Sequence, residues 1–538
     1  MGYKAFVCLM LCVLLLAGCA NNTAPELSGA VKTQQALDKI NALGYTVPDD
    51  NYRTWYEVFV YSFCDSNGDG IGDLKGLQSK LDYLQELGIA GLWLMPIHPS
   101  TTYHKYNVAD YYAIDPAYGT MEDMEALLAE CQQRNIRVIL DLVVNHTGYD
   151  HPWFTAAHDY LKTLPAGATP DSSVCPYVDY YHFSRETGRK LEGTDYCYEA
   201  MFSQDMPDLN LDNPEVRAEI EQVMKFWLDK GVAGFRLDAA KEFFSGRVSK
   251  NVEVLSWLQK AATDIKEDAY LVAEVWDNFS NVTAYYESGI TSIFNYPFGD
   301  ASGKIIAVIR GADNPAVVST YATALEKADK AYLGQNPNYI DAPFLSNHDV
   351  GRIAGFCGQD EQRTKLAGAM NLFMGGSAFI YYGEEIGMIG SGNDSSKRAP
   401  MYWNAPGDNG VTDPPPECTV PVYPFPALEE QRNTDGSIYN YYRQAIAIRN
   451  AIPAIARGRV TAETALNTGC VSAQRKTWGD QACIILMNIS QEAATVDLTD
   501  YADWSLAATL CTGDEPVTLT ETTLHLPAFG IAILTSGK

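Results

Sequence analysis

Short apolar runs alternate along the chain with segments whose apolar residues recur at helical spacing. The runs at 55–63, 89–97 and 136–146 have the pattern of buried strands, and 74–88 and 121–135 have that of amphipathic helices. Strands and helices that alternate with short connections predict a parallel sheet. Enough repeats of this unit close the sheet into a barrel.

The alternation lapses between 148 and 203, where Tyr, Pro and Asp are frequent, and this stretch predicts a domain inserted at the rim of the barrel. It resumes with a helix from Pro214 to Lys230 and ends with a helix from Ser437 to Ala451. The remaining strand-like runs lie at 231–238, 271–275, 292–296, 341–346 and 378–382. From about 457 onward the apolar residues alternate with period two, which predicts a small antiparallel β domain.

We therefore expect an α/β fold, a (β/α)8 TIM barrel with an inserted rim domain after the third strand and a C-terminal antiparallel β domain. The expected boundaries are a signal peptide at 1–18, a tether at 19–50, barrel segments at 51–147 and 204–456, an inserted domain at 148–203 and a β domain at 457–538.

The N-terminus has the features of an export signal. Lys4 precedes an apolar run from Ala5 to Ala17 that is too short to span a bilayer as a mature helix. The run ends in Leu-Ala-Gly-Cys19, which resembles the lipobox of bacterial lipoproteins. The resemblance implies cleavage before Cys19, a lipid on its thiol, and anchoring to the outer face of a bacterial membrane. The alternative is a plain secretory signal in which Cys19 is incidental.

The balance of charges argues against one class of partner. The 538 residues carry a formal net charge of −28. A chain this acidic repels phosphate backbones, so nucleic acid is not an expected partner, whereas neutral ligands are unaffected.

Four apolar runs end in acidic or imidazole side chains, in the segments 141–147, 234–242, 271–277 and 344–349. The strands of a parallel barrel end at one common rim, so these groups should meet there. They are Asp141, His146, Arg236, Asp238, Glu274, His348 and Asp349.

A glycosidase needs an ionised carboxylate and a protonated carboxylic acid on either side of the scissile bond. Asp238 and Glu274 end consecutive strands, and Arg236 faces the same rim as Asp238 because strand side chains repeat with period two. The charge of Arg236 favours an ionised Asp238, and the apolar frame of Glu274 raises its pKa. A metal-dependent barrel hydrolase is disfavoured, because no strand ends in His-x-His.

These segments resemble the conserved regions of the α-amylase family, glycoside hydrolase family 13, in order and spacing. DLVVNHT, GFRLDAAKE, EVW and FLSNHD match its four main regions, and MPDLN, GLWLMPI and AFIYYGEEIGM match three further ones. The resemblance implies that Asp238 is the nucleophile, Glu274 the general acid/base and Asp349 the third carboxylate, and leaves Asp141 a structural role. The substrate contacts it implies are Tyr106, His146, Arg236, Lys241, His348 and Arg352.

The implied activity is retaining hydrolysis of α-1,4-glucosidic bonds in starch, maltodextrins or related α-glucans. Within the family, the alternatives are an exo-acting α-glucosidase, a cyclomaltodextrinase or neopullulanase, and a transglycosylase. A non-catalytic glycan-binding lipoprotein is the alternative from another class. The chain departs from the family pattern YHGYDVTDYY at Lys105, in place of Gly, and at Asn107, in place of an Asp common in exo-acting α-glucosidases.

The segment DSNGDGIGD (65–73) has oxygen-bearing residues at the spacing of a calcium loop, with Gly70 at the sharp turn. Its expected ligands are Asp65, Asn67, Asp69, Ile71 and Asp73. The alternative is a solvated acidic turn. The family resemblance also implies a possible second calcium site, with Asn145 and Asp208 as ligands.

Overall fold

A parallel sheet of seven strands forms the centre of the molecule, in a computed structural model that describes residues 29–44, 48–404 and 410–536. The strands lie in the order β10-β1-β2-β3-β7-β8-β9, and every neighbouring pair is parallel. They are β1 (Thr54–Val58), β2 (Gly91–Leu94), β3 (Arg137–Leu142), β7 (Gly234–Leu237), β8 (Tyr270–Ala273), β9 (Ser292–Ile293) and β10 (Ala378–Tyr381).

The curled sheet confirms the predicted barrel fold, with one local difference. The run 341–346 forms no strand, and Ala342 pairs with Phe294 in an isolated parallel bridge beside β9. The predicted helix at 74–88 is also divided, because Lys80 leaves helical geometry between α2 (Leu74–Ser79) and α3 (Leu81–Leu87).

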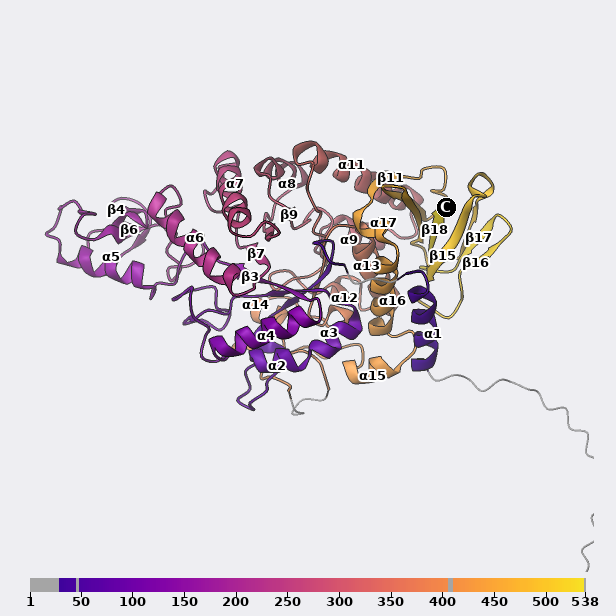
Figure 1. Cartoon of the computed structure of the whole chain (residues 1–538), viewed down its shortest axis with the longest axis horizontal. Coiled ribbons are helices and arrows are strands. Elements are labelled where there is room, and N and C mark those ends of the chain that lie inside the picture. The colour runs from indigo at the N-terminus through magenta and orange to yellow at the C-terminus, as the bar shows by residue number, and fades with distance from the viewer. Residues whose placement is uncertain (1–28, 45–47, 405–409, 537–538) are drawn as a thin grey trace, which may run out of the picture.

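Helices surround the sheet on its outer side (Figure 1). The longer ones are α4 (Met121–Gln133), α6 (Pro214–Asp229), α7 (Val248–Ile265), α11 (Thr320–Gln335), α13 (Glu361–Met374) and α16 (Ile438–Ala451). The shorter ones are α8 (Phe279–Tyr285), α9 (Lys304–Arg310), α10 (Pro315–Val318), α12 (Ile353–Phe356), α14 (Asp394–Lys397), α15 (Leu428–Asn433) and α17 (Pro453–Arg457).

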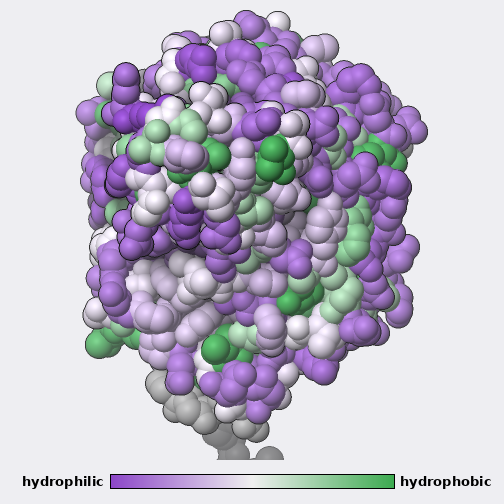
Figure 2. Space-filling model, turned by 90° about the vertical axis from the view of Figure 1, so that its left-hand side faces the viewer, coloured by the Kyte–Doolittle hydropathy of each residue, from purple (hydrophilic) through white to green (hydrophobic). Residues whose placement is uncertain are grey.

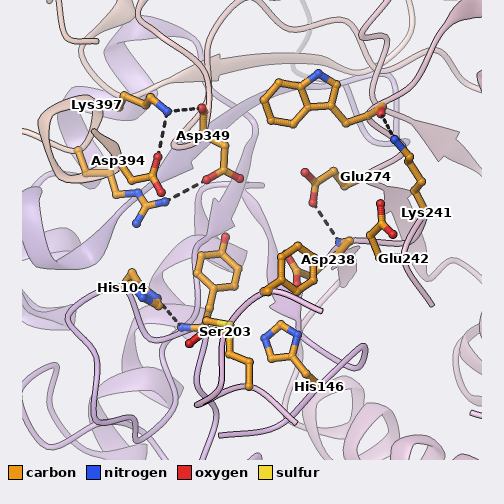
Figure 3. A pocket seen from close by; sticks show the side chains of 16 residues that line it. His104, His146, Ser203, Asp238, Lys241, Glu242, Glu274, Asp349, Asp394 and Lys397 are labelled. Atoms are coloured by element: carbon orange, nitrogen blue, oxygen red, sulfur yellow. Dashed lines mark hydrogen bonds and ion pairs between the residues drawn. The ribbon is translucent and has the colours of Figure 1, made fainter. Parts of the chain in front are cut away.

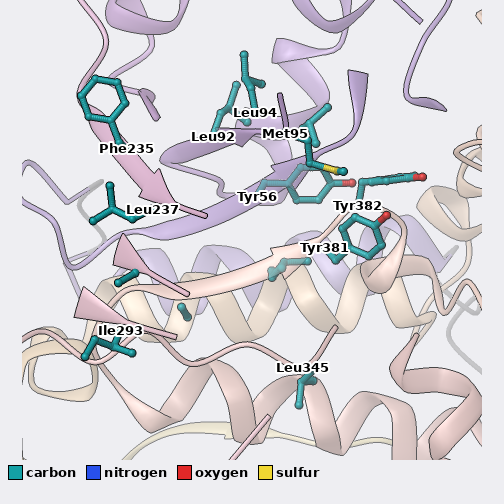
Figure 4. Packing of buried hydrophobic residues seen from close by; sticks show 14 of the residues in the cluster. Tyr56, Leu92, Leu94, Met95, Phe235, Leu237, Ile293, Leu345, Tyr381 and Tyr382 are labelled. Carbon is teal, nitrogen blue, oxygen red and sulfur yellow. The ribbon is translucent and has the colours of Figure 1, made fainter. Parts of the chain in front are cut away.

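Side chains of the strands alternate between the barrel interior and the layer under the helices. On β1, Trp55 lies in the interior cluster and stacks on Tyr270 at 5.0 Å between ring centroids. The next residue, Tyr56, belongs to the outer layer together with Leu92 and Leu237, which Figure 4 shows around the strands. The barrel is therefore filled on both sides of its wall, and reactive groups are left at its ends.

The inserted segment forms a small domain at one end of the molecule (Figure 1). It contains α5 (Pro152–Thr163) and a sheet of β4 (Phe183–Ser184), β6 (Cys197–Tyr198) and β5 (Arg189–Lys190). Figure 2 views this end, whose surface is mainly hydrophilic with scattered hydrophobic residues.

The C-terminal segment forms two antiparallel sheets at the opposite end (Figure 1). One has the order β11-β12-β13-β18-β15 and the other β14-β17-β16. Their strands are β11 (Arg459–Ala462), β12 (Val471–Trp478), β13 (Gln481–Asn488), β14 (Ala494–Asp497), β15 (Trp504–Leu510), β16 (Thr518–Thr520), β17 (Thr523–Leu526) and β18 (Ile531–Ser536).

Part of the segment expected to be a tether is helical. Helix α1 (Gly29–Asn41) packs against α16, and Thr33 donates a hydrogen bond of 2.8 Å to Asp435. The expected signal peptide and Cys19 lie outside the described residues. Within the described ranges, no helix has both the length and the apolar character needed to cross a bilayer.

Candidate active site

A cavity of about 730 Å³ opens where β7 and β8 end, and it contains most of the predicted site residues (Figure 3). Six of them line it: Tyr106, His146, Asp238, Lys241, Glu274 and Asp349. The other lining residues are His104, Phe202, Ser203, Met206, Ala239, Glu242, Trp276, Asp394, Lys397 and Arg398. Arg236 and His348 are buried just beneath this surface.

Arg236 joins the carboxyl groups of three consecutive strands. Its Nη1 lies 2.6 Å from Asp141 Oδ1 and 2.7 Å from Asp238 Oδ1. Its Nη2 lies 2.6 Å from Glu274 Oε2. Because Asp238 and Glu274 share one guanidinium, they are held side by side at the cavity floor. Burial raises the pKa of Asp238, and the charge of Arg236 opposes that rise.

The two oxygens of Glu274 have different surroundings. Oε2 accepts hydrogen bonds from Arg236 and from the main-chain N–H of Ala239, at 2.6 and 3.0 Å. Oε1 faces the hydroxyl of Tyr296, at the longer distance of 3.4 Å. Burial raises the pKa of Glu274. The arrangement therefore favours a protonated Glu274 whose proton is on Oε1, as a general acid requires.

Asp349 has the opposite electrostatic environment. Its Oδ1 lies 3.0 Å from Arg398 Nη2, and its Oδ2 lies 2.9 Å from His348 Nε2. Burial alone would raise the pKa of Asp349, but the charges of His348 and Arg398 hold it below its ordinary value. The cavity thus contains carboxyl groups with divergent pKa values, which allows acid and ionised roles in one site.

Tyr106 and His146 complete the wall beside Asp238. The Tyr106 hydroxyl donates to Asp141 at 3.0 Å and lies 2.6 Å from His348 Nε2. Burial lowers the pKa of His146 to about 4, so this imidazole is neutral near pH 7. Its Nε2 is buried and has no hydrogen-bond partner among the described residues.

Of two further residues predicted to contact the substrate, Lys241 lines the cavity and Arg352 does not. Lys241 lines the cavity, and its Nζ donates to the Trp276 carbonyl at 3.1 Å. Arg352 is turned away from the cavity. It donates to the carbonyls of Lys397 and Tyr382, and its guanidinium lies over the ring of Tyr381.

Several lining residues were not predicted from the sequence. Trp276 and Phe202 are 46% and 48% exposed, and such open aromatic faces can stack on sugar rings. Trp276 in turn stacks on Tyr296 at 5.2 Å. Arg398 and Asp394 lie in the segment that follows β10. Trp276 follows Glu274 by two residues, so period two along the chain was a usable signal for it. No comparable pattern marks 394–398.

The loop 65–73 forms a series of tight turns. Asp65 accepts main-chain N–H groups of Asn67, Gly68 and Gly70 at 2.9, 2.7 and 2.8 Å. Asp73 caps α2 through the N–H of Gly76 at 2.7 Å. The groups of this loop that are expected to bind a metal all offer oxygen atoms, which calcium prefers as ligands. In the described part of the chain, however, no three Asp, Glu, His or Cys side chains are gathered for a metal. Calcium at this loop stays a prediction.

The second expected calcium pair is joined directly. Asn145 Nδ2 donates to Asp208 Oδ1 at 3.2 Å, and the main-chain N–H of Met201 donates to the other oxygen of Asp208 at 2.9 Å. Burial raises the pKa of Asp208 to about 7. Calcium at this pair also stays a prediction.

Paired carboxyl groups at the C-terminal rim of a parallel barrel are the arrangement that a glycoside hydrolase needs. Comparison with known proteins identifies the family. The model for the α-amylase catalytic domain matches residues 57–458. The chain belongs to the α-amylase family, which confirms the family predicted from the motifs.

Three relatives illustrate the range of similarity. The chain is 41% identical to Alpha-amylase 3 of Dictyoglomus thermophilum over 426 residues, which cover 78% of this chain and 81% of that protein. It is 31% identical to a cyclomaltodextrinase of Geobacillus thermopakistaniensis over 466 residues, covering 86% and 70% of the two chains. The solved structure of Eubacterium rectale Amy13B matches with a TM-score of 0.90 at 45% identity, covering 94% of this chain and 99% of that one.

Proposed function

We propose that the protein hydrolyses α-1,4-glucosidic bonds of starch, maltodextrins or related α-glucans, with retention of the anomeric configuration. Asp238 is the nucleophile, Glu274 is the general acid/base, and Asp349 binds hydroxyls of the sugar at the cleavage position. The α-amylases among the relatives support the substrate class.

The observation that carries this proposal is the bridge of Arg236 between Asp238 and Glu274. Retaining glycosidases hold the nucleophile and the acid about 5–5.5 Å apart, whereas inverting enzymes separate them by about 6.5–9.5 Å to admit a water molecule. Two carboxyls that bind adjacent nitrogens of one guanidinium are close neighbours, which supports the retaining geometry.

The reaction has two steps. A carboxylate oxygen of Asp238 attacks the anomeric carbon while Glu274 Oε1 gives its proton to the departing glycosidic oxygen. The glycosidic bond breaks and a glycosyl ester with Asp238 forms. Glu274, now ionised, takes a proton from a water molecule whose oxygen attacks the anomeric carbon and releases Asp238.

The test is a product-time profile on maltoheptaose, pullulan and cyclodextrin, with the anomer of the first product read by NMR. We expect α-configured products from maltoheptaose and their loss in Asp238→Asn. Mid-sized early products mean endo action, glucose alone means exo action, and preferred cleavage of cyclodextrin means a cyclomaltodextrinase. Products longer than the substrate mean a transglycosylase. No product from any glycan, or undiminished activity in Asp238→Asn, would refute the proposal.

We propose calcium binding by the loop 65–73 as a separate point, supported by its set of oxygen donors within nine residues. Chelation with EDTA should then lower the midpoint of thermal unfolding, and added calcium should restore it. Asp69→Ala should remove this response. An unfolding midpoint that is the same with EDTA and with calcium would contradict the proposal.

We also propose that the mature chain begins at Cys19 and is lipid-anchored on the outer face of a bacterial membrane, on the basis of the lipobox-like segment. Expression of the full chain with radiolabelled palmitate tests this, because label should enter the protein and be absent from Cys19→Ala. Equal labelling of both, or of neither, would contradict it.

A further inference from the structure

Glu57 is a carboxylate inside the barrel, below the catalytic rim. On β1 it follows Trp55 by two residues, so its side chain points into the interior as that of Trp55 does. It is fully buried. A buried carboxyl group is costly unless a partner compensates it. Its partner is His348, whose Nδ1 lies 2.6 Å from Glu57 Oε1.

The other nitrogen of His348 faces the cavity. Its Nε2 lies 2.9 Å from Asp349 Oδ2 and 2.6 Å from the Tyr106 hydroxyl. That hydroxyl donates its hydrogen bond to Asp141, so it accepts one from Nε2. An ionised carboxylate can only accept. Burial raises the pKa of Glu57, and the charges of His348 and Arg236 oppose that rise. When Glu57 and Asp349 are both ionised, both nitrogens of His348 must carry protons, and the ring is then an imidazolium between two carboxylates.

Charged and titratable side chains surround His348 from several elements of the barrel. They are Glu57 on β1, Asp141 at the end of β3, Arg236 and Asp238 at the end of β7, and Asp349 and Arg398 on the rim. Tyr106 stacks on the ring, Trp93 packs against it in a T-shaped arrangement, and Tyr381 lies near Glu57. Burial alone would lower the pKa of His348, but Asp349 and Glu57 raise it to about 9.

We propose that Glu57 is a positioning residue: through its ion pair with Nδ1 it keeps His348 doubly protonated and aims Nε2 at Asp349, which holds that carboxylate ionised and oriented toward the sugar. Glu57 itself does not line the cavity. The effect on turnover rests on the proposed function, whereas the protonation of His348 is a property of the free protein.

The first experiment needs no substrate, and the titration is measured on the wild-type protein. Histidine labelled with 15N is followed by NMR from pH 6 to pH 10, and the His348 signals are assigned by their loss in His348→Asn. We expect imidazolium shifts at both nitrogens at pH 7.5. A neutral His348 at that pH would overturn the proposal, because a protonated Glu57 would then donate to Nδ1.

The second experiment uses Glu57→Gln, which keeps a polar side chain of the same shape but removes the charge. The midpoint of the His348 titration should fall by about one to three pH units, the effect of one close opposite charge. If catalysis proceeds as proposed, kcat on maltoheptaose falls about 10- to 100-fold, the scale of about 1.4–2.7 kcal/mol. KM should change little, and the alkaline limb of the activity profile should move to lower pH.

The matched control is Glu385→Gln, another fully buried carboxyl, which accepts from the hydroxyls of Tyr56 and Tyr83. It should change stability without moving the His348 titration. An unmoved titration in Glu57→Gln would overturn the proposal even if activity fell. Inactive wild-type protein with an imidazolium at His348 would refute the proposed function and leave the role of Glu57 standing.

Discussion

The main-chain N–H of Ala239 donates a hydrogen bond of 3.0 Å to Oε2 of Glu274. Ala239 adopts the left-handed region, with φ of 47°. For a residue with a Cβ this conformation costs about 1–2 kcal/mol, and such strain is concentrated at functional sites. At Ala239 this left-handed conformation turns the chain directly after Asp238. The main-chain N–H therefore points at Glu274, the proposed general acid. The backbone thus selects which oxygen of Glu274 retains the proton.

Substitutions of Ala239 should follow backbone preference rather than size. Ala239→Gly and Ala239→Asn accept positive φ and should keep kcat within about twofold, because both residues populate this region. Ala239→Val is β-branched and should lower kcat about tenfold or more. Its pH profile should also change, since losing a donor to the ionised form raises the pKa of Glu274. An inactive Asn variant beside an active Gly variant would show that bulk in the cavity is what matters.

The second prediction separates proton donation from nucleophilic attack. Glu274→Gln should lower kcat on maltoheptaose by about 10²–10⁴-fold, the range of general acid–base catalysis. With α-maltosyl fluoride, whose leaving group needs no proton, the loss in the first step should be far smaller. Asp238→Asn should abolish turnover of both substrates. Stopped-flow release of fluoride measures the first step, and equal losses on the two substrates would contradict the role of Glu274.

The strand-end carboxylates were predictable because the signal is local. A buried strand that ends in Asp238 or Glu274 places its carboxyl at the rim whatever the rest of the chain does. Glu57 gave no such signal, because it lies within a strand and its partner His348 is 291 residues away. The sequence also did not show that 341–346 forms only an isolated bridge. An apolar run does not reveal whether its backbone makes the repeated hydrogen bonds of a strand.

Helix 29–41 illustrates a second limit. Its polar composition suggested an irregular tether, yet α1 lies along α16. The packing surface belongs to a helix about 400 residues further along the chain, so the sequence near α1 could not reveal it. Arg398 was missed for a related reason. Its contact with Asp349 depends on how the segment after β10 returns over the rim.

The third prediction concerns the departure from the family pattern at Lys105. Its Nζ forms a buried ion pair with Asp115 at 2.7 Å, and its backbone has φ of 65°. The pair ties down the loop that presents the next residue, Tyr106. Lys105→Met leaves Asp115 uncompensated and should lower the free energy of unfolding by about 3–5 kcal/mol, the usual effect of breaking a buried pair.

Two further variants show whether the unpaired charge of Asp115 or the backbone at Lys105 causes the loss of stability. Lys105→Gly relieves the backbone but also leaves the charge of Asp115 unpaired, so it should be destabilised as well. The double variant Lys105→Met/Asp115→Leu should recover much of the loss, since a buried pair can be replaced by apolar residues. Urea unfolding monitored by tryptophan fluorescence measures all three. A double variant no more stable than Lys105→Met would show that the packing of the loop, not the charge, is limiting.

The fourth prediction is a loss of stability with rising pH that originates in Glu384. This carboxyl is fully buried after β10, and Oε1 accepts from the Tyr442 hydroxyl at 3.1 Å. Burial raises its pKa from 4.5 to about 8. The folded protein therefore keeps a proton that the unfolded chain releases above pH 4.5. Stability from this group is complete below that pH and is lost as the pH rises through 8.

One such proton changes the free energy of unfolding by about 1.4 kcal/mol per pH unit between these two pKa values. Glu384→Gln cannot titrate, so its stability should depend less steeply on pH by that amount. Other groups contribute to the total slope. His348, with its pKa raised to about 9, also binds a proton in the folded state that the unfolded chain releases above about pH 6.5. The informative quantity is thus the difference between the variant and the wild type. Urea unfolding at pH 6, 6.5, 7 and 7.5 measures it, and parallel pH dependences would show that Glu384 is ionised in the folded protein.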